Sequence, residues 1–277
     1  MTNSPFPSSE DFAGRSVIVT GGGGVLCGAM SRVLASAGAK TAVLDIKAEA
    51  AETLAKEIGD GGGKAIGVGC DVLDREQLEA AAEKIRNAFG GIDMLINGAG
   101  GNKPQATTSA EASFFDLPPD ALRWVMDLNL MGVVLPSQVI GKVMAAQKRG
   151  VILNIASMNA FRPLTRIPAY SAAKAGVANF TQWLAVHMAQ EYSPEIRVNA
   201  IAPGFFLTKQ NRFLLTEKSS GELTPRGRTI LDHTPMKRFG APEDLMGAML
   251  WLLSPASAFV TGVVIPVDGG YSAFGGV

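Results

Sequence analysis

The amino-acid sequence predicts an α/β protein, a parallel sheet of about seven strands with helices packed on both of its faces. Short β-branched runs alternate along the chain with longer stretches of helical character, which is the pattern of repeated βαβ units. A run of glycines at 21–24 directly follows the first of these strands, and polar residues end most of the later ones. Right-handed crossovers place helices on both faces, so the expected architecture is a doubly wound sheet of the Rossmann type.

The expected strands share an apolar composition and end at a glycine, a proline or a polar residue. They are 16–20, 41–44, 64–70, 92–96, 151–155, 196–201 and 263–267. The expected helices lie between the strands, and proline, aspartate or glycine marks several of their ends. They are 25–37, 48–58, 74–89, 118–147, 170–192 and 242–253. Residues 205–235 break this rhythm, and we expect them to form a flap over the substrate within a single domain spanning 1–277.

Composition excludes several classes of protein. The chain of 277 residues carries 25 basic and 25 acidic side chains, so no whole-molecule field attracts nucleic acid or anionic lipid. It has only two cysteines, Cys27 and Cys70, which predicts no disulfide framework. The start of the chain is polar, and glycine, proline or charged residues interrupt each apolar run. We expect a cytoplasmic protein with no membrane contact and no metal site.

Tyr170 and Lys174 are the first candidates for catalysis. Pro168 lies just upstream and is a helix-opening signal, so the two side chains project from one face of a helix, one turn apart. A phenol titrates near ~10, and a cation beside it favours the phenolate. Such a pair is a plausible general acid and base. The same spacing also fits an amphipathic helix with a half-buried tyrosine and a lysine that reaches solvent.

Further candidates lie where ligands bind in parallel sheets, beyond the carboxyl ends of the strands. They are Gly21, Gly23, Gly24, Asp45, Asp71, Asn97, Ser157, Pro203 and Gly204. The glycine run lets backbone N–H groups approach a pyrophosphate at a helix N-terminus. Asp45 is placed to bond an adenosine ribose diol and would repel a 2′-phosphate, which favours NAD (NADH) over NADP, although Lys47 is nearby. Asp71 could bond the adenine amino group or cap the following helix.

Over nearly its whole length the chain resembles the short-chain dehydrogenase/reductase family. The resemblance lies in a set of motifs in a fixed order. They are Thr20-Gly21 with the following glycines, Asn97-Gly98-Ala99-Gly100, Asn129, Ser157, Tyr170 with Lys174, Pro203-Gly204 with Thr208, and Val267-Asp268-Gly269-Gly270. One departure is that Val25 and Cys27 stand where the family usually has glycine.

The resemblance implies an NAD-dependent oxidoreductase that acts on CH–OH groups, with four catalytic residues. Tyr170 would exchange a proton with the substrate oxygen, and Lys174 would lower the pKa of Tyr170 and hold the nicotinamide ribose. Ser157 would orient the same oxygen, and Asn129 would position a water that links Lys174 to solvent. The positions expected to bind the cofactor are Gly21, Gly23, Gly24, Val25, Leu26, Asp45, Asp71, Val72, Asn97, Gly98, Ala99, Tyr170, Lys174, Pro203, Gly204, Phe206 and Thr208.

A closer resemblance is to the short-chain-type D-mannonate oxidoreductases, also called fructuronate reductases. It rests on the glycine turn that reads Gly-Val-Leu, on Asn97-Gly-Ala-Gly-Gly-Asn-Lys-Pro, on Ser157-Met-Asn-Ala-Phe-Arg-Pro-Leu-Thr-Arg, on Ala202-Pro-Gly-Phe-Phe-Leu-Thr and on His233-Thr-Pro-Met. It implies a sugar-acid substrate, D-fructuronate or D-mannonate. A guanidinium can grip the carboxylate of such a substrate with two hydrogen bonds. The positions expected to bind it are Asn102, Lys103, Ser157, Asn159, Arg162, Arg166, Tyr170 and Arg212.

Several alternatives stay open at this point. Arg162 and Arg166 could instead serve solubility or a salt bridge between subunits. The substrate could be another polyol or gluconate-type compound, and a more remote alternative is a nucleotide-sensing protein without catalysis. The family resemblance implies a homotetramer, and the apolar, glycine-rich tail from Tyr271 is a candidate for contact with a neighbouring subunit.

Overall fold

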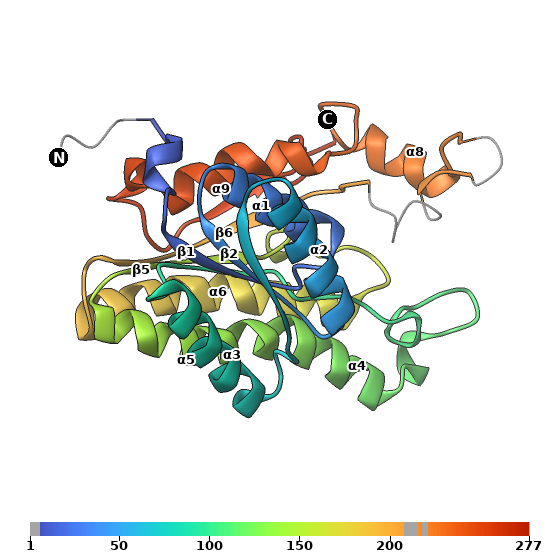
Figure 1. Ribbon diagram of the computed structural model, residues 1–277. Coiled ribbons are helices and arrows are strands. Elements are labelled where there is room, and N and C mark those ends of the chain that lie inside the picture. The colour runs from blue at the N-terminus through green and yellow to red at the C-terminus, as the bar shows by residue number, and fades with distance from the viewer. Residues whose placement is uncertain (1–5, 208–214, 218–220, 277) are drawn as a thin grey trace.

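The computed structural model describes residues 6–207, 215–217 and 221–276. A seven-stranded sheet with the order β3-β2-β1-β4-β5-β6-β7 forms its centre (Figure 1). All of its strand pairs are parallel, which confirms the predicted fold. The strands are β1 Ser16–Thr20, β2 Lys40–Asp45, β3 Lys64–Gly69, β4 Met94–Asn97, β5 Gly150–Ile155, β6 Ile196–Pro203 and β7 Val264–Val267.

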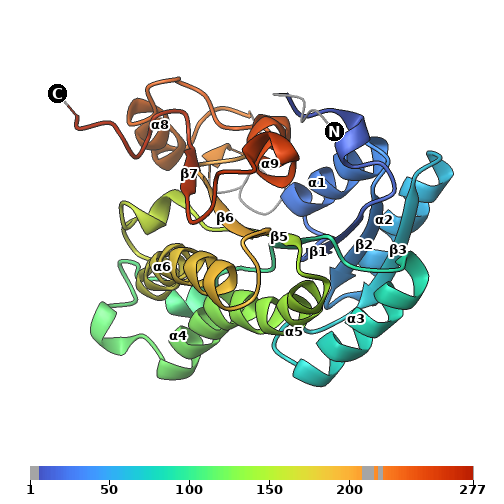
Figure 2. The ribbon, with the colours of Figure 1, turned by 90° about the vertical axis from the view of Figure 1, so that its left-hand side faces the viewer.

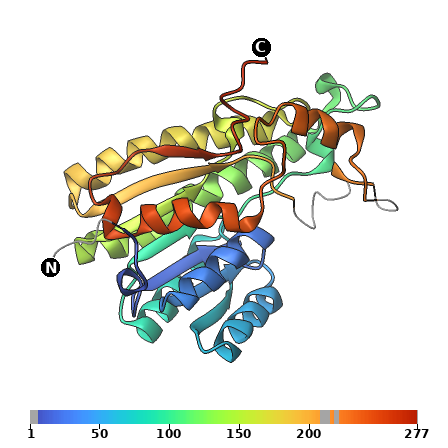
Figure 3. The ribbon, with the colours of Figure 1, turned by 90° about the horizontal axis from the view of Figure 1, so that it is seen from above.

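Helices cover both faces of the sheet. They are α1 Val25–Ser36, α2 Ala48–Asp60, α3 Arg75–Phe89, α4 Pro119–Met126, α5 Gly132–Gln147, α6 Pro168–Glu191, α8 Pro225–Asp232 and α9 Met246–Leu253. On one face α3, α5 and α6 pack against the sheet, and on the other face α1, α2 and α9 do so (Figures 2 and 3). Alternate residues of β1 pack on opposite faces of the sheet. Ile18 belongs to the core beneath α3, α5 and α6, and Val17 and Val19 belong to the core beneath α1 and α9.

The strand order reverses direction between β1 and β4, which is the switch point at which sheets of this type bind ligands. The carboxyl ends of β2, β5 and β6 lie along the same edge, because every pair is parallel and in register. The predicted site residues that follow these strands are therefore brought to one edge of the sheet.

The helix predicted over 118–147 is interrupted in the structure. A π-helical segment, Asp127–Met131, separates α4 from α5 and is centred on Asn129. The side-chain amide of Asn129 donates to the carbonyl of Val125 at 2.8 Å and to that of Gly101 at 2.6 Å. A side chain that takes over a carbonyl of the preceding turn favours such a bulge, and bulges of this kind often mark functional sites.

By length and composition Pro119–Gln147 could cross a membrane, with a mean hydropathy of 1.3 in its most apolar window. Glycine, proline and charged residues nevertheless interrupt this stretch, as predicted. Half of that window is buried inside the structure, and Val139, Ile140 and Met144 belong to the core beneath the sheet. The apolar character of the stretch is that of a core helix.

Candidate active site

The Tyr170–Lys174 pair lies in the first turns of α6, which begins at Pro168 as predicted. Lys174 is buried, with 4% of its surface exposed, and its ammonium donates to the carbonyl of Ile155 at 2.8 Å. Its Nζ atom lies 5.7 Å from the centre of the Tyr170 ring. Burial lowers the pKa of Lys174 from 10.5 to about 8, because the charged form loses its hydration. The lysine therefore points inward to the end of β5, and a solvent-reaching side chain is excluded.

Tyr170 is coupled to Ser157, which follows β5. Burial raises the pKa of Tyr170 above its ordinary value, and a side-chain hydrogen bond with Ser157 acts in the lowering direction. Lys174 is not among the causes of this shift, so the expected lowering of the Tyr170 pKa by Lys174 is not found in this structure. The Ser157 hydroxyl also accepts from the backbone N–H of Asn159 at 3.3 Å, which fixes its direction. Two hydroxyl groups next to a buried ammonium can share a proton with one substrate oxygen.

Asn129 is held beside this pair by the loop that follows β4. Its Oδ1 atom accepts from the N–H of Gly101 at 3.2 Å. A Cβ atom placed on Gly100 would lie 2.8 Å from that Oδ1 atom and 3.6 Å from Nζ of Lys174. The backbone of Gly100 therefore lies between Asn129 and Lys174 and leaves room only for glycine. The structure brings all four predicted catalytic residues into one cluster.

The glycine turn after β1 fits the pyrophosphate of a dinucleotide. Gly21 has a φ angle of 64°, and a Cβ atom there would lie 2.8 Å from Cα of Ala99. Gly24 is the N-cap of α1 and offers no side-chain cap. The N–H groups of Val25 and Leu26 have no partner within the helix, since the first four N–H groups of a helix never do, and they lie at its positive end. An anion at this position is stabilised by those donors.

Asp45 closes β2 next to the glycine turn. Its Oδ2 atom accepts from the N–H of Gly23 at 3.1 Å, and its Oδ1 atom accepts from that of Lys47 at 3.0 Å. These two hydrogen bonds fix the carboxylate beside the glycine turn. Asp71 follows β3, and its carboxylate accepts from Leu73 at 2.9 Å. The alternative that Asp71 caps the next helix is wrong, because Asp74 caps α3 through the N–H of Gln77.

The segment after β4 is tied to the end of β1. The Thr20 hydroxyl accepts from the N–H groups of Gly98 at 3.0 Å and Ala99 at 3.2 Å. The Asn97 side chain is fully buried and donates to Ser137 and to Asn154, both at 2.9 Å. Asn97 therefore joins β4 to β5 and α5, and only its backbone faces the loop edge. Val72, after β3, is likewise buried, with 6% of its surface exposed.

The segment after β6 packs tightly on the end of β7. The N–H of Gly204, next to Pro203, donates to the carbonyl of Val267 at 3.0 Å, and a Cβ atom there would lie 2.6 Å from Cα of Asp268. Phe206 is buried and pairs with Gly240. Two further predicted site residues, Thr208 and Arg212, lie outside the described residues.

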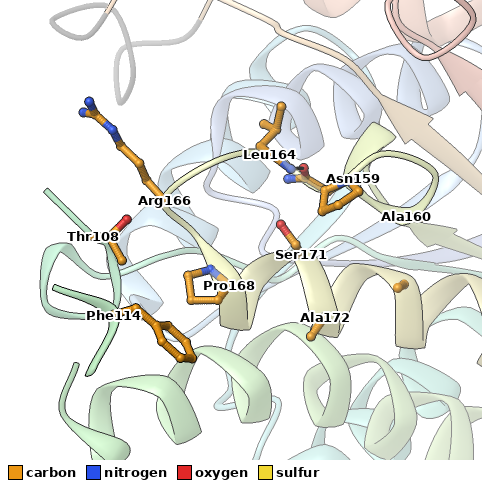
Figure 4. Close-up of a pocket in the computed structure, with 11 residues that line it drawn as sticks. Thr108, Phe114, Asn159, Ala160, Leu164, Arg166, Pro168, Ser171 and Ala172 are labelled. Atoms are coloured by element: carbon orange, nitrogen blue, oxygen red, sulfur yellow. Dashed lines mark hydrogen bonds between the residues drawn. The ribbon is translucent and has the colours of Figure 1, made fainter. Parts of the chain in front are cut away.

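The predicted substrate-binding residues do not all face the catalytic cluster. Lys103 lies over the ring of Trp124 in α4, with Nζ 4.0 Å from the ring centre, and Asn102 donates to Thr107 at 3.0 Å. Asn159 and Arg166 line a cavity of about 580 Å³ beside the start of α6 (Figure 4). Tyr170 and Lys174 are not among the residues that line it, and the Arg166 side chain extends away from Ser171.

Sequence reasoning missed three residues that shape this region. Thr20 anchors the loop after β4, Gly100 leaves the space between Asn129 and Lys174, and Tyr271 contacts Phe205 at a ring-centre distance of 5.2 Å. The first two lie inside motifs that the sequence did show. Among the residues that the structure describes, no group of three or more His, Cys, Asp or Glu side chains could hold a metal ion.

Known proteins are similar to this chain in sequence and in fold. A family model described as "Enoyl-(Acyl carrier protein) reductase" (adh_short_C2) matches residues 26–272. The chain belongs to the short-chain dehydrogenase/reductase family. Members of this family are oxidoreductases that use NAD(P), and this chain is accordingly an oxidoreductase that acts on alcohol groups.

Three similar proteins match nearly the whole chain. The uncharacterized oxidoreductase UxuB of Bacillus subtilis (strain 168) is 50% identical over 98% of this chain and 99% of its own. The 5-keto-D-gluconate 5-reductase of Escherichia coli (strain K12) is 31% identical, over 93% and 95%. A solved structure from Haemophilus influenza, provisionally named a D-mannonate oxidoreductase and containing bound NAD, is 48% identical. It superposes with a TM-score of 0.90 and covers 96% of this chain and 97% of its own.

Proposed function

We propose that the chain, acting as one dinucleotide-binding unit, catalyses the NAD-dependent interconversion of a keto sugar acid and its hydroxy acid, with D-fructuronate and D-mannonate as the pair. The observation that carries the chemistry is the Ser157–Tyr170 hydroxyl pair beside the buried ammonium of Lys174. The likeness to the NAD-containing structure of the same provisional name supports the choice of substrate.

In the reduction, the Tyr170 hydroxyl gives its proton to the substrate carbonyl oxygen as that oxygen gains negative charge. NADH, when bound, would supply the hydride for the carbonyl carbon. The Ser157 hydroxyl donates a hydrogen bond to the same oxygen and holds it in place. The positive charge of Lys174 stabilises the phenolate left on Tyr170, and Asn129 holds the loop at Gly101 against the lysine. In the oxidation each step runs in reverse, with the Tyr170 phenolate as the base.

The cofactor preference follows from Asp45. Its carboxylate is anchored by the backbone of Gly23 and Lys47 at the end of β2, and a ribose diol can donate to it. A 2′-phosphate at the same place would be repelled by the carboxylate. The N–H groups at the start of α1 would hold the pyrophosphate. We therefore assign NAD(H) as the working cofactor.

A second candidate substrate class is gluconate-type keto acids, favoured by the similarity to 5-keto-D-gluconate 5-reductase. Both classes carry a carboxylate and several hydroxyl groups. Initial rates with NADH on D-fructuronate, D-tagaturonate, 5-keto-D-gluconate and neutral ketoses separate them. We expect the highest kcat/KM on D-fructuronate, and absence of turnover on every uronate would refute the narrower proposal.

We also propose that two copies pair along α6, as a step toward the expected homotetramer in the cytoplasm. The cavity of Figure 4 and the exposed surface around Trp183 both involve α6, and four residues of each lie at sequence positions mirrored about Asn179. The residues of α6 that line the cavity are Pro168, Ser171, Ala172 and Ala175. The residues equally far from Asn179 in the other direction along the sequence are, in the same order, Gln190, His187, Val186 and Trp183. An antiparallel crossing at Asn179 thus places Trp183 of a second copy over Ala175.

Two observations support this crossing. Trp183 is 57% exposed although its ring stacks on His187 at 4.8 Å, and the Ser171 hydroxyl is buried without a hydrogen-bond partner among the described residues. His187 of the second copy would reach that hydroxyl. Sedimentation should show Trp183→Asp as a smaller species than the native protein, and an unchanged mass would contradict the pairing.

A further inference from the structure

The turn that follows β7 presents Tyr271 to the flap. The Asp268 carboxylate accepts from the N–H of Gly270 at 2.9 Å and from that of Ser272 at 2.8 Å, which fixes the turn. The carbonyl of Gly269 accepts from Met236 at 3.1 Å, so the turn is tied to the segment that follows α8. The C-terminal tail lies beside α8 of its own chain (Figures 1 and 2).

Tyr271 stands between the end of β6 and one face of α8. Its ring meets that of Phe205 edge-on at 5.2 Å and lies 6.5 Å from the ring of His233. Arg226 and His233 are seven residues apart, at the start and the C-cap of α8, and therefore lie on the same helix face. The Tyr271 ring next to His233 is thus on the face that carries Arg226.

Two guanidinium groups from different segments act on the Tyr271 hydroxyl. Burial raises the pKa of Tyr271, while the positive charges of Arg226 and Arg162 lower it. Arg226 comes from the flap, and Arg162 comes from the loop five residues after Ser157. The two sides of the cleft that follow β5 and β6 thus each contribute one cation near a single phenol.

Within the described ranges no acidic side chain forms an ion pair with Arg162 or Arg226. Two other described cations of this region are engaged elsewhere, since Arg238 pairs with Asp244 at 2.6 Å and Lys103 lies over an indole ring. Two free guanidinium groups and a phenol hydroxyl form a donor set that suits a carboxylate.

We propose that Arg162, Arg226 and Tyr271 form a carboxylate clamp that binds the acid end of the substrate. The clamp rests on the proposed function, because it requires a substrate that carries a carboxylate. Phe205 follows Gly204 at the end of β6, and Ser157 follows the neighbouring strand β5, so the clamp and the catalytic hydroxyl pair belong to the same edge of the sheet. A substrate whose carbonyl meets Tyr170 would extend its carboxylate to the clamp, which adds two positions, Arg226 and Tyr271, that the sequence did not indicate.

The test compares ligands that differ only in the carboxylate. D-Gluconate and D-glucitol are titrated into the NADH-bound protein and followed by nucleotide fluorescence, and D-fructuronate and D-fructose are compared as substrates. The variants are Arg226→Gln and Tyr271→Phe. Arg228→Gln is the matched control, because Arg228 is exposed on the same helix and lies about 200° around it from Arg226.

We expect Arg226→Gln to weaken D-gluconate binding and raise KM for the acid at least about tenfold, with D-glucitol and D-fructose changed less than about twofold. Tyr271→Phe should act in the same direction but less strongly, and Arg226→Lys should recover part of the loss. Equal losses for the acid and the neutral partner, no loss at all, or the same loss in Arg228→Gln would overturn the clamp. If the native protein binds D-gluconate selectively but reduces no keto sugar acid, the clamp stands and the proposed function fails.

Discussion

Replacing Lys174 by methionine should stabilise the folded chain while it removes activity. The ammonium is buried and makes one hydrogen bond, to the carbonyl of Ile155. Its pKa falls from 10.5 to about 8, and each pKa unit is worth about 1.4 kcal/mol. At neutral pH, burying the charge therefore costs the folded state about 3 kcal/mol.

Methionine has a similar length and carries no charge, so Lys174→Met removes that cost. It also leaves the Ile155 carbonyl without its donor, a loss of about 1 kcal/mol. The expected net gain in the free energy of unfolding is about 2 kcal/mol at pH 7. Core substitutions usually lower the free energy of unfolding, whereas this one should raise it. The reason is that the native residue at this position serves catalysis at the expense of stability.

The gain should depend on pH in one direction. The folded-state pKa of Lys174 is depressed, so its cost is fully present below pH 8 and disappears as the pH rises past 10.5, where the unfolded lysine is also neutral. The measurement is urea unfolding without nucleotide at fixed protein concentration. The difference in the free energy of unfolding between Lys174→Met and the native protein should shrink between pH 7 and pH 10. Lys84→Met, at an exposed position on α3, is the control and should change stability by less than about 0.5 kcal/mol. A variant at position 174 that unfolds more easily than the native protein at pH 7 would refute this reasoning.

Two further predictions concern the nucleotide side. Asp45→Ala should lower kcat/KM for NADH about tenfold and kcat/KM for NADPH less, because it removes a charged acceptor that also holds Gly23. Initial rates measure both values. An unchanged ratio of kcat/KM for NADH to kcat/KM for NADPH would contradict the assigned role. Gly98→Ala should lower the free energy of unfolding by about 1–3 kcal/mol, because the new methyl group would fall on the Cys27 sulfur. Adding Cys27→Ala should restore part of the loss in a thermal melt, and an equally unstable double variant would count against a steric cause.

Some of this structure can be predicted from the sequence because its signals are local. Strands buried on both faces are continuous apolar runs such as 16–20, and Pro168 marks the start of the helix that carries the catalytic pair. The spacing of Tyr170 and Lys174 was enough to place both side chains on one helix face. The expectation that they cooperate agrees with the distance of 5.7 Å between the ammonium and the ring.

Other features depend on contacts between distant segments and were not predictable. The side chain of Asn129, at the centre of the π-helical turn, bonds Gly101, which is 28 residues away. Lys103 turns from the cleft because Trp124 offers its ring face. The tail was a candidate for contact with a neighbouring subunit, yet Tyr271 packs on Phe205 of its own chain, and nothing near residue 271 in the sequence indicates that partner.

In the proposed mechanism the Tyr170 hydroxyl exchanges a proton with the reacting oxygen of a keto sugar acid. The most direct measurement is the single-turnover rate of D-fructuronate reduction by NADH in the Tyr170→Phe variant, together with its NADH affinity. General acid catalysis is worth about 10²–10⁴-fold, so the rate should fall by at least about a hundredfold while NADH binds within a few fold of the native affinity. A variant that binds NADH normally and keeps more than about a tenth of the native rate would contradict the mechanism.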